Sequence, residues 1–124
     1  MIFSKLLNKL IMKNLSETTE FAQKLIVKKS VTPNDDGAIK VLKKKLSEIG
    51  FKNIDLPFGS KKKNNLILNL FSINKSKKLN NKTLCFAGHT DVVPEGDCKK
   101  WKYDPFLGKV SGGKLHGRGA SDMK

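Results

Sequence analysis

The amino-acid sequence predicts an α/β domain in which helices pack on a mixed β-sheet. Two early stretches repeat apolar residues at helical spacing, and three later stretches are short apolar runs bounded by polar turns. The chain has 124 residues, enough for one domain with a modest core. We therefore expect a domain over residues 15–124, preceded by an extension over residues 1–14.

The extension carries an apolar stripe. Residues 1–13 place five apolar side chains on one side of a helix: Phe3, Leu6, Leu7, Leu10 and Ile11. Such a stripe suits a small amphipathic anchor, but it is too short to cross a bilayer and lacks the cleavage site of a secretory signal. We favour an extra segment ahead of the domain, with Met12 as an alternative start to Met1. Without an export signal, the expected location is the cytoplasm.

Two helices are predicted next. The first covers residues 15–29, with Ser16 as its N-cap and apolar side chains along one side. A break follows at residues 30–33, which read Ser-Val-Thr-Pro. Asn34, Asp35 and Asp36 then offer caps for a second helix, whose apolar positions keep helical spacing until Gly50 ends it.

Three apolar runs predict strands, over residues 51–56, 65–73 and 83–87. Residues 57–64 are expected to form an exposed connection. Cys85 lies in the third run and is expected in the core. Its spacing from Cys98 matches no paired-thiol motif, so nothing calls for an oxidising compartment. Residues 107–116 predict a hairpin.

The net charge of +14 first suggests a nucleic acid or a membrane surface as partner. The excess is nearly all lysine, and Arg118 is the only arginine. Proteins that bind nucleic acids tend to interleave arginine and aromatic residues with their lysines, whereas a lysine bias is typical of an AT-rich genome. We therefore predict no specific nucleic-acid partner and no membrane partner. A small basic nucleic-acid-binding protein is kept as the alternative from another class.

A histidine and an aspartate follow the third apolar run, in the order His89-Thr90-Asp91. In an extended chain, side chains two residues apart leave on the same face, so Asp91 can hold the second imidazole nitrogen of His89. A carboxylate in that position fixes the tautomer and raises the basicity of metal-ligating histidines. The alternative is a strand-end histidine hydrogen-bonded to an ordinary turn aspartate.

A second carboxylate, Asp122, follows the glycine-rich turn Gly117-Arg118-Gly119. Glycines near a carboxylate let the backbone approach closely, which helps to place a ligand that bridges two cations. Two metal ions that share a carboxylate can activate water and polarise an amide carbonyl. Spacing alone does not establish this role, because an aspartate in such a sequence is more often a helix cap.

Other ligand-binding patterns fit less well. Residues 108–115 match a phosphate loop except that Leu115 stands where the magnesium-binding hydroxyl belongs, and Gly117-x-Gly119 lacks the third glycine of a dinucleotide fingerprint. A zinc module is conceivable on ligand type, but its spacings match no compact zinc finger; it would use Cys85, His89, Cys98 and His116.

Two long motif runs, FAGHTDVVPEGD over residues 86–97 and GKLHGRGASDMK over residues 113–124, lie either side of Trp101 and Asp104-Pro105-Phe106. Together they strongly resemble the co-catalytic zinc aminoacylase and carboxypeptidase superfamily. The likeness covers roughly residues 16–124. It is closest to the desuccinylase branch, which hydrolyses N-succinyl-LL-2,6-diaminopimelate to succinate and LL-diaminopimelate in lysine biosynthesis.

The resemblance implies a role for each motif residue. His89 would ligate one metal, Asp122 would bridge both, and Asp91 would act in catalysis by orienting His89. Gly117, Arg118 and Gly119 would shape the turn that presents Asp122, whereas His116 would be structural. The resemblance also implies two zinc ions, with cobalt as a substitute, a small succinylated amino-acid substrate and a homodimer of the complete enzyme.

The superfamily's other catalytic parts lie beyond the bridging aspartate and have no counterpart in residues 1–124. They are the paired glutamates, a further acidic ligand, a late histidine and the dimerisation domain. The resemblance therefore implies that residues 15–124 are the truncated N-terminal part of a zinc-peptidase-like catalytic domain, inactive by itself. Another peptidase or N-acyl-amino-acid deacylase of the same superfamily is the alternative.

Overall fold

The computed structural model describes residues 16–63, 65–75 and 82–124, so the expected extension over residues 1–14 lies outside the described residues. Residues 16–26 are helical. The elements that follow are α2 (Ala38–Glu48), β1 (Lys52–Phe58), the 3₁₀ helix η1 (Lys61–Lys63), β2 (Ile67–Ile73), the 3₁₀ helix η2 (Cys98–Lys100), β3 (Lys109–Ser111) and β4 (Lys114–His116).

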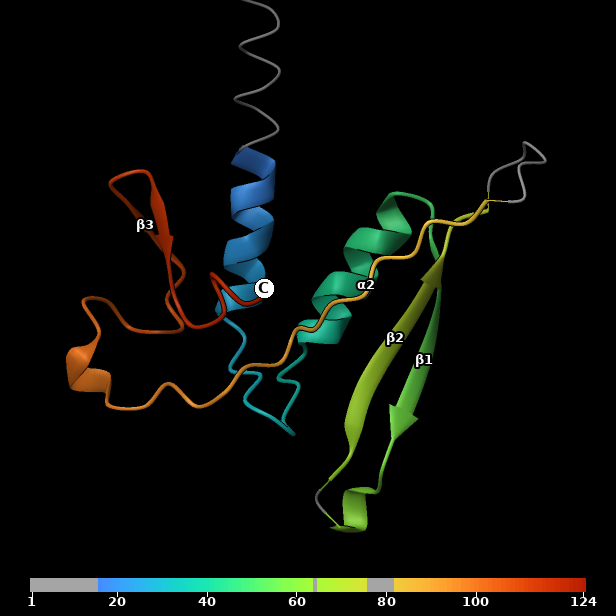
Figure 1. The fold of residues 1–124 in the computed structure, drawn as a ribbon, viewed down its shortest axis with the longest axis horizontal. Coiled ribbons are helices and arrows are strands. Elements are labelled where there is room, and N and C mark those ends of the chain that lie inside the picture. Colours follow the sequence, from blue (N-terminus) through green and yellow to red (C-terminus); the bar gives the residue numbers. More distant parts are fainter. Residues whose placement is uncertain (1–15, 64, 76–81) are drawn as a thin grey trace, which may run out of the picture.

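These elements fall into two regions (Figure 1). In one, α2 packs on the hairpin of β1 and β2. In the other, the helix over residues 16–26 stands beside the C-terminal turn, with the short β3–β4 hairpin next to it. Extended chain after residue 82 joins the hairpin of the first region to the loops of the second.

Local chemistry sets both ends of α2. Asp35 Oδ1 accepts a hydrogen bond from the Ile39 backbone N–H at 3.0 Å, just ahead of the first turn. At the other end the Phe51 N–H donates to the Leu46 carbonyl at 2.9 Å, and Gly50 has a φ of 89°. The second predicted helix is therefore confirmed, together with its end at Gly50, but its N-cap is Gly37, without a side-chain cap, and not one of the predicted residues Asn34, Asp35 and Asp36.

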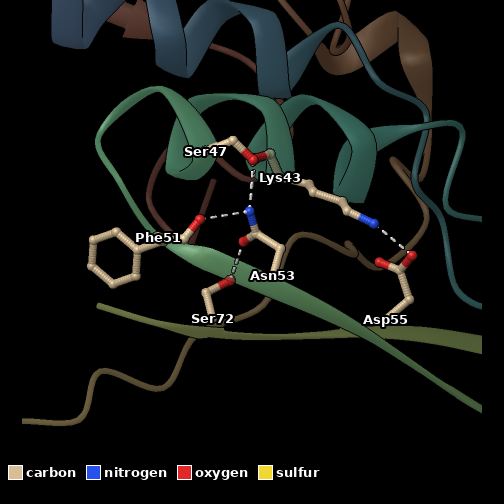
Figure 2. Close-up of polar contacts among 6 residues, drawn as sticks. All are labelled: Lys43, Ser47, Phe51, Asn53, Asp55 and Ser72. Atoms are coloured by element: carbon tan, nitrogen blue, oxygen red, sulfur yellow. Dashed lines mark hydrogen bonds and ion pairs between the residues drawn. The ribbon is translucent and has the colours of Figure 1, made fainter. Parts of the chain in front are cut away.

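Polar side chains on one face of the β1–β2 hairpin join it to α2. The Asn53 side-chain amide donates to Ser47 Oγ at 2.7 Å and to the Lys43 and Phe51 carbonyls, each at 3.3 Å. Its Oδ1 accepts from Ser72 Oγ at 2.6 Å (Figure 2). One side chain thus joins α2 to both strands.

The opposite face of this hairpin is apolar. Asp55 pairs with Lys43 of α2 at 2.6 Å, so the alternate residues of β1 point away from the helix. These are Ile54, Leu56 and Phe58, which are 50%, 50% and 77% exposed. We call this the outer face of the hairpin.

The buried core is small and lies mainly in the other region. Its apolar members are Leu25, Ile26, Ala38, Val92 and Phe106, and the Ser30 side chain is fully buried with them. Since all of these residues lie in residues 25–38 and 92–106, the core of the described part of the chain forms where the N-terminal helix and the segment after it meet the C-terminal loops.

The prediction of a third strand over residues 83–87 is wrong. These residues are extended but belong to no strand, and Leu84 and Phe86 are 80% and 88% exposed. Cys85 is exposed as well, so its expected place in the core is also wrong. An apolar run becomes a strand only when a neighbour supplies the backbone hydrogen bonds, and no strand in the described ranges pairs with it.

The described strands do not form a mixed sheet, so that part of the predicted fold class is wrong. They form two separate antiparallel hairpins, β1–β2 and β3–β4. The β3–β4 hairpin confirms the hairpin expected over residues 107–116. Strand β1 continues to Phe58 and so takes up the first two residues of the connection expected over residues 57–64. Within the described residues, parallel pairing occurs at the isolated bridge between Val31 and Val92. The α/β class itself holds.

None of the helices that the structure describes is both long and apolar enough to cross a membrane.

Candidate metal centre

Two segments that are far apart in the sequence bring a histidine and a carboxylate together. His89 Nε2 lies 3.2 Å from Asp122 Oδ1, although the residues are 33 positions apart. The side chains remain open to solvent, with His89 46% and Asp122 84% exposed. The pair therefore lies at the surface of the described part of the chain.

The loop that carries His89 is held by the break after the first helix. The Val92 N–H donates to the Ser30 carbonyl at 2.9 Å, and the Thr32 N–H donates to the Val92 carbonyl at 3.3 Å. Ser30 Oγ, which is buried, also donates to the Thr90 carbonyl at 2.6 Å. These bonds fix the backbone directly after His89. Sequence reasoning missed Ser30 and Thr32, because their partners lie about 60 positions away.

The turn that carries Asp122 depends on two glycines. A Cβ added at Gly117 would lie 2.4 Å from Ile26 Cγ2, and one at Gly119 would lie 2.9 Å from Val92 Cγ1. Gly119 also has a φ of 89°, which other residues rarely adopt. The missing side chains let the turn lie directly on the core and on the loop that follows His89.

The turn closes on itself and is fastened beyond Asp122. The Asp122 and Lys124 N–H groups both donate to the Gly119 carbonyl, at 3.2 Å and 2.9 Å. The Lys124 ammonium donates to the Lys28 carbonyl. The peptide bond between Asp122 and Met123 is cis.

The hydrogen bonds of His89 indicate which ring nitrogen is unprotonated and so able to bind a metal ion. Nδ1 lies 3.0 Å from the backbone carbonyl of Asp91, and a carbonyl only accepts, so Nδ1 carries the proton. The Asp91 carboxylate is farther from Nδ1, at 3.4 Å, and accepts from Thr32 Oγ1 at 2.5 Å. Thus the Asp91 main chain, more than its side chain, orients the ring.

The remaining nitrogen and the carboxylate call for a positive charge between them. With Nδ1 protonated, a neutral His89 presents the Nε2 lone pair to the lone pairs of Asp122, which is unfavourable without a second proton or a cation. Two ligand atoms on a tetrahedral zinc ion, each about 2.0–2.1 Å from it, stand about 3.3 Å apart. The observed 3.2 Å fits two ligands of one ion.

The surroundings also change the acidity of the imidazole. The Asp91 carbonyl, assisted by the Asp122 carboxylate and the charges of both residues, raises the pKa of His89 above 6.5, while burial, the second-largest influence, acts in the opposite direction. Because a metal binds the neutral ring, protons compete with it, and metal affinity should fall as the pH falls through this raised pKa.

His89 and Asp122 are an incomplete ligand set. No group of three or more His, Cys, Asp or Glu side chains lies close enough to hold a metal ion in the part of the chain that the structure describes. Zinc normally takes four ligands. The donor chemistry fits zinc or cobalt, and these two side chains alone would not fill the coordination shell of such an ion.

Among the described residues, the other candidates form no metal-binding group with this pair, although His116 borders the same cavity as Asp122. His116 packs edge-on against Tyr103 with ring centres 5.0 Å apart, and its Nε2 lies 3.3 Å from the Ser111 carbonyl. Cys85 and Cys98 are exposed free thiols. The environment of His116 suits a structural role.

Comparison with known proteins first shows similarity to one peptidase family. Residues 85–124 match the model of peptidase family M20/M25/M40, and this span contains His89, Asp91 and Asp122. The match confirms the resemblance on which the motif analysis rested.

Within this similarity, individual proteins of known name resemble the chain over most of its length. The chain is 45% identical over 111 residues to the succinyl-diaminopimelate desuccinylase of Hahella chejuensis, covering 90% of this chain and 27% of that protein. It is 47% identical over 105 residues to the enzyme of the same name from Ehrlichia canis, covering 85% and 26%. For that of Nitrosomonas europaea the identity is 42% over 109 residues, covering 88% and 27%. The chain spans about a quarter of the length of these relatives.

Proposed function

We propose that this chain is part of a metal-dependent amide hydrolase that releases succinate from N-succinyl-LL-2,6-diaminopimelate, in the synthesis of diaminopimelate and lysine. The observation that carries the proposal is the 3.2 Å approach of His89 Nε2 to Asp122 Oδ1, inside the segment that matches the peptidase family. The names of the similar proteins support the choice of substrate.

In this proposal each motif residue has one task. His89 would ligate a metal through Nε2, with Asp91 orienting the ring through its main chain, and Asp122 would be a ligand shared between two metals. Gly117, Arg118 and Gly119 shape the turn. Two zinc ions, or cobalt in their place, would polarise the amide carbonyl and lower the pKa of a bound water.

Hydrolysis needs a proton acceptor as well as a metal. A general base must lie within hydrogen-bond reach of the attacking water. Among the described residues, the carboxylates near His89 are Asp91 and Asp122, which this proposal assigns to orienting the ring and binding metal. The general base is therefore proposed to lie outside residues 1–124, so that these residues alone bind zinc weakly and do not hydrolyse the substrate.

The test uses the product of the whole reading frame that encodes these residues, loaded with zinc and assayed for succinate release. We expect turnover in the wild type, and in Asp122→Asn a loss of activity with a zinc Kd raised by more than about 100-fold, because changes around metal ligands already cost 10–100-fold. Lys100→Ala, an exposed change away from the pair, should behave as wild type. Release of succinate by residues 1–124 alone at a comparable rate would contradict the proposed division of roles.

A panel of acylated amino acids and dipeptides separates the proposal from its alternative within the family. Preference for a dipeptide or for another acyl group would make the protein a peptidase or a different N-acyl-amino-acid deacylase. The homodimer, the cytoplasmic location and the lack of a nucleic-acid partner remain predictions alongside this proposal.

A further inference from the structure

Two neighbouring side chains, Arg118 and Trp101, donate hydrogen bonds to the same backbone carbonyl oxygen. The Arg118 guanidinium lies over the Trp101 ring, 5.1 Å from its centre. Arg118 Nη2 donates to the Glu95 carbonyl at 3.1 Å, and Trp101 Nε1 donates to the same oxygen at 3.0 Å. We call these two side chains and the Glu95 carbonyl the clamp.

The clamp joins the two segments that carry His89 and Asp122. Glu95 lies six residues after His89, and Arg118 lies four residues before Asp122. The Arg118 N–H also donates to the Pro105 carbonyl at 2.7 Å, which ties the start of the turn to the loop over residues 101–106.

The Asp122 side chain itself is little constrained by packing. It is 84% exposed and borders a cavity of about 360 Å³ that Trp101, Tyr103 and Arg118 also line. Because packing does not fix the carboxylate, its place relative to His89 depends on how the turn is anchored. Lys124 anchors the turn after Asp122, and the clamp anchors it before.

The clamp needs arginine rather than any cation. Within the described residues, Arg118 pairs with no carboxylate, and its buried Nε has no hydrogen-bond partner. The planar guanidinium lies over the indole while pointing one N–H at the carbonyl, whereas a lysine ammonium would keep the charge without the fixed fork of N–H donors.

We propose that Arg118 and Trp101 are positioning residues, which set the distance between Asp122 and His89 and thereby the metal affinity of the site. This inference rests on the proposed function and adds to it a pair of side chains that would not touch metal or substrate.

The first experiment measures zinc affinity and the visible absorption spectrum of the cobalt form in the complete protein. Arg118→Lys should raise the zinc Kd about tenfold, in the range for side chains that orient metal ligands, and change the cobalt spectrum. Trp101→Phe, which keeps the ring and loses the N–H, should have a smaller effect of about threefold. In the double variant the combined effect should be less than the product of the two, because each residue needs the other.

Two controls separate positioning from general loss of structure. Lys100→Ala, a neighbouring exposed lysine, should leave both readouts unchanged. The Tm of Arg118→Lys, compared with that of wild type, reports overall stability, which does not by itself move the cobalt spectrum. Wild-type zinc affinity and an unchanged cobalt spectrum in both Arg118→Lys and Trp101→Phe would overturn the inference.

A second readout needs no metal. Spin labels at the exposed positions Val93 and Ser121, with Cys85 and Cys98 changed to serine, report the distance between the two segments. Arg118→Lys should broaden the distance distribution, and an unchanged distribution would count against the clamp. If the wild type binds no zinc, the proposed function fails, and this measurement still decides whether the clamp holds the segments together.

Discussion

The α2–β1–β2 region and the loops over residues 88–124 differ in what holds them together. In the first region, Asn53 bonds to Ser47 and Ser72, which are six and 19 positions away. In the second, the bond from Ser30 to Thr90 spans 60 positions and that from Gln23 to Gly108 spans 85. The first region can therefore form through contacts between residues close in the sequence. The second forms only when residues 23–32 meet residues 88–124.

The difference has a consequence for the candidate centre. His89 and Asp122 belong wholly to the region of long-range contacts, so whatever loosens the core beneath the loops should separate them. Changes in the β1–β2 hairpin should cost stability and leave the pair in place. Three predictions test this contrast.

The largest expected effect is that of Gly117→Ala. The added Cβ would lie 2.4 Å from Ile26 Cγ2, so the turn must move off the core. We expect a loss of about 2–3 kcal/mol in the free energy of unfolding, measured with urea, because overpacking a rigid site costs this much. Zinc affinity should fall in parallel.

Gly96→Ala is the matched control. Gly96 also has a positive φ, 75°, but a Cβ there meets nothing within 4 Å. Only backbone strain of about 1 kcal/mol should remain. Equal losses in the two variants would show that the contact with Ile26 does not hold the turn.

A smaller effect is expected for Asn53→Ala in the other region. The substitution removes the hydrogen bonds that join α2 to both strands, and should lower the free energy of unfolding by about 1–2 kcal/mol. Zinc affinity should not change. Asn69→Ala, which removes a single bond to the Leu56 carbonyl, is the control and should cost less. A fall in zinc affinity on Asn53→Ala would refute the independence of the two regions.

The smallest effect concerns the titration of His89. Its raised pKa means that the protonated ring stabilises the fold below about pH 6.5, and that this contribution is lost as the pH rises through the folded-state pKa. Asp122→Asn removes one cause of the shift, so the pKa of His89 should fall toward 6.5 in metal-free protein. NMR titration of the imidazole measures this, with the His116 resonances as an internal control. An unchanged His89 pKa would mean that the two side chains do not meet in solution.

The same contrast explains how far the sequence could predict the fold. The C-terminal end of α2 was predictable, because Gly50 acts on its immediate neighbours, whereas the N-cap falls on Gly37 and not on a predicted polar residue. The run over residues 83–87 has the composition of a strand, but pairing depends on a partner that local sequence does not name.

For the candidate site, the sequence predicts which residues take part more readily than it predicts the contacts between them. The motif runs contain His89, Asp91 and Asp122, whose roles as ligands and orienter remain predictions. The motif could not show that the main chain of Asp91 lies nearer to the ring than its carboxylate. Nor could it place Trp101 on Arg118, since stacking across 17 positions leaves no periodic signal.

The outer face of the β1–β2 hairpin bears on how this polypeptide behaves in solution. Ile54, Leu56 and Phe58 form an exposed apolar strip, and Phe86 adds a further solvent-exposed aromatic ring. Surfaces of this kind attract each other when molecules collide, while the net charge of +14 drives them apart. Added salt screens that repulsion without weakening the hydrophobic attraction. These 124 residues should therefore stay monomeric in buffer of low ionic strength and aggregate as the ionic strength rises.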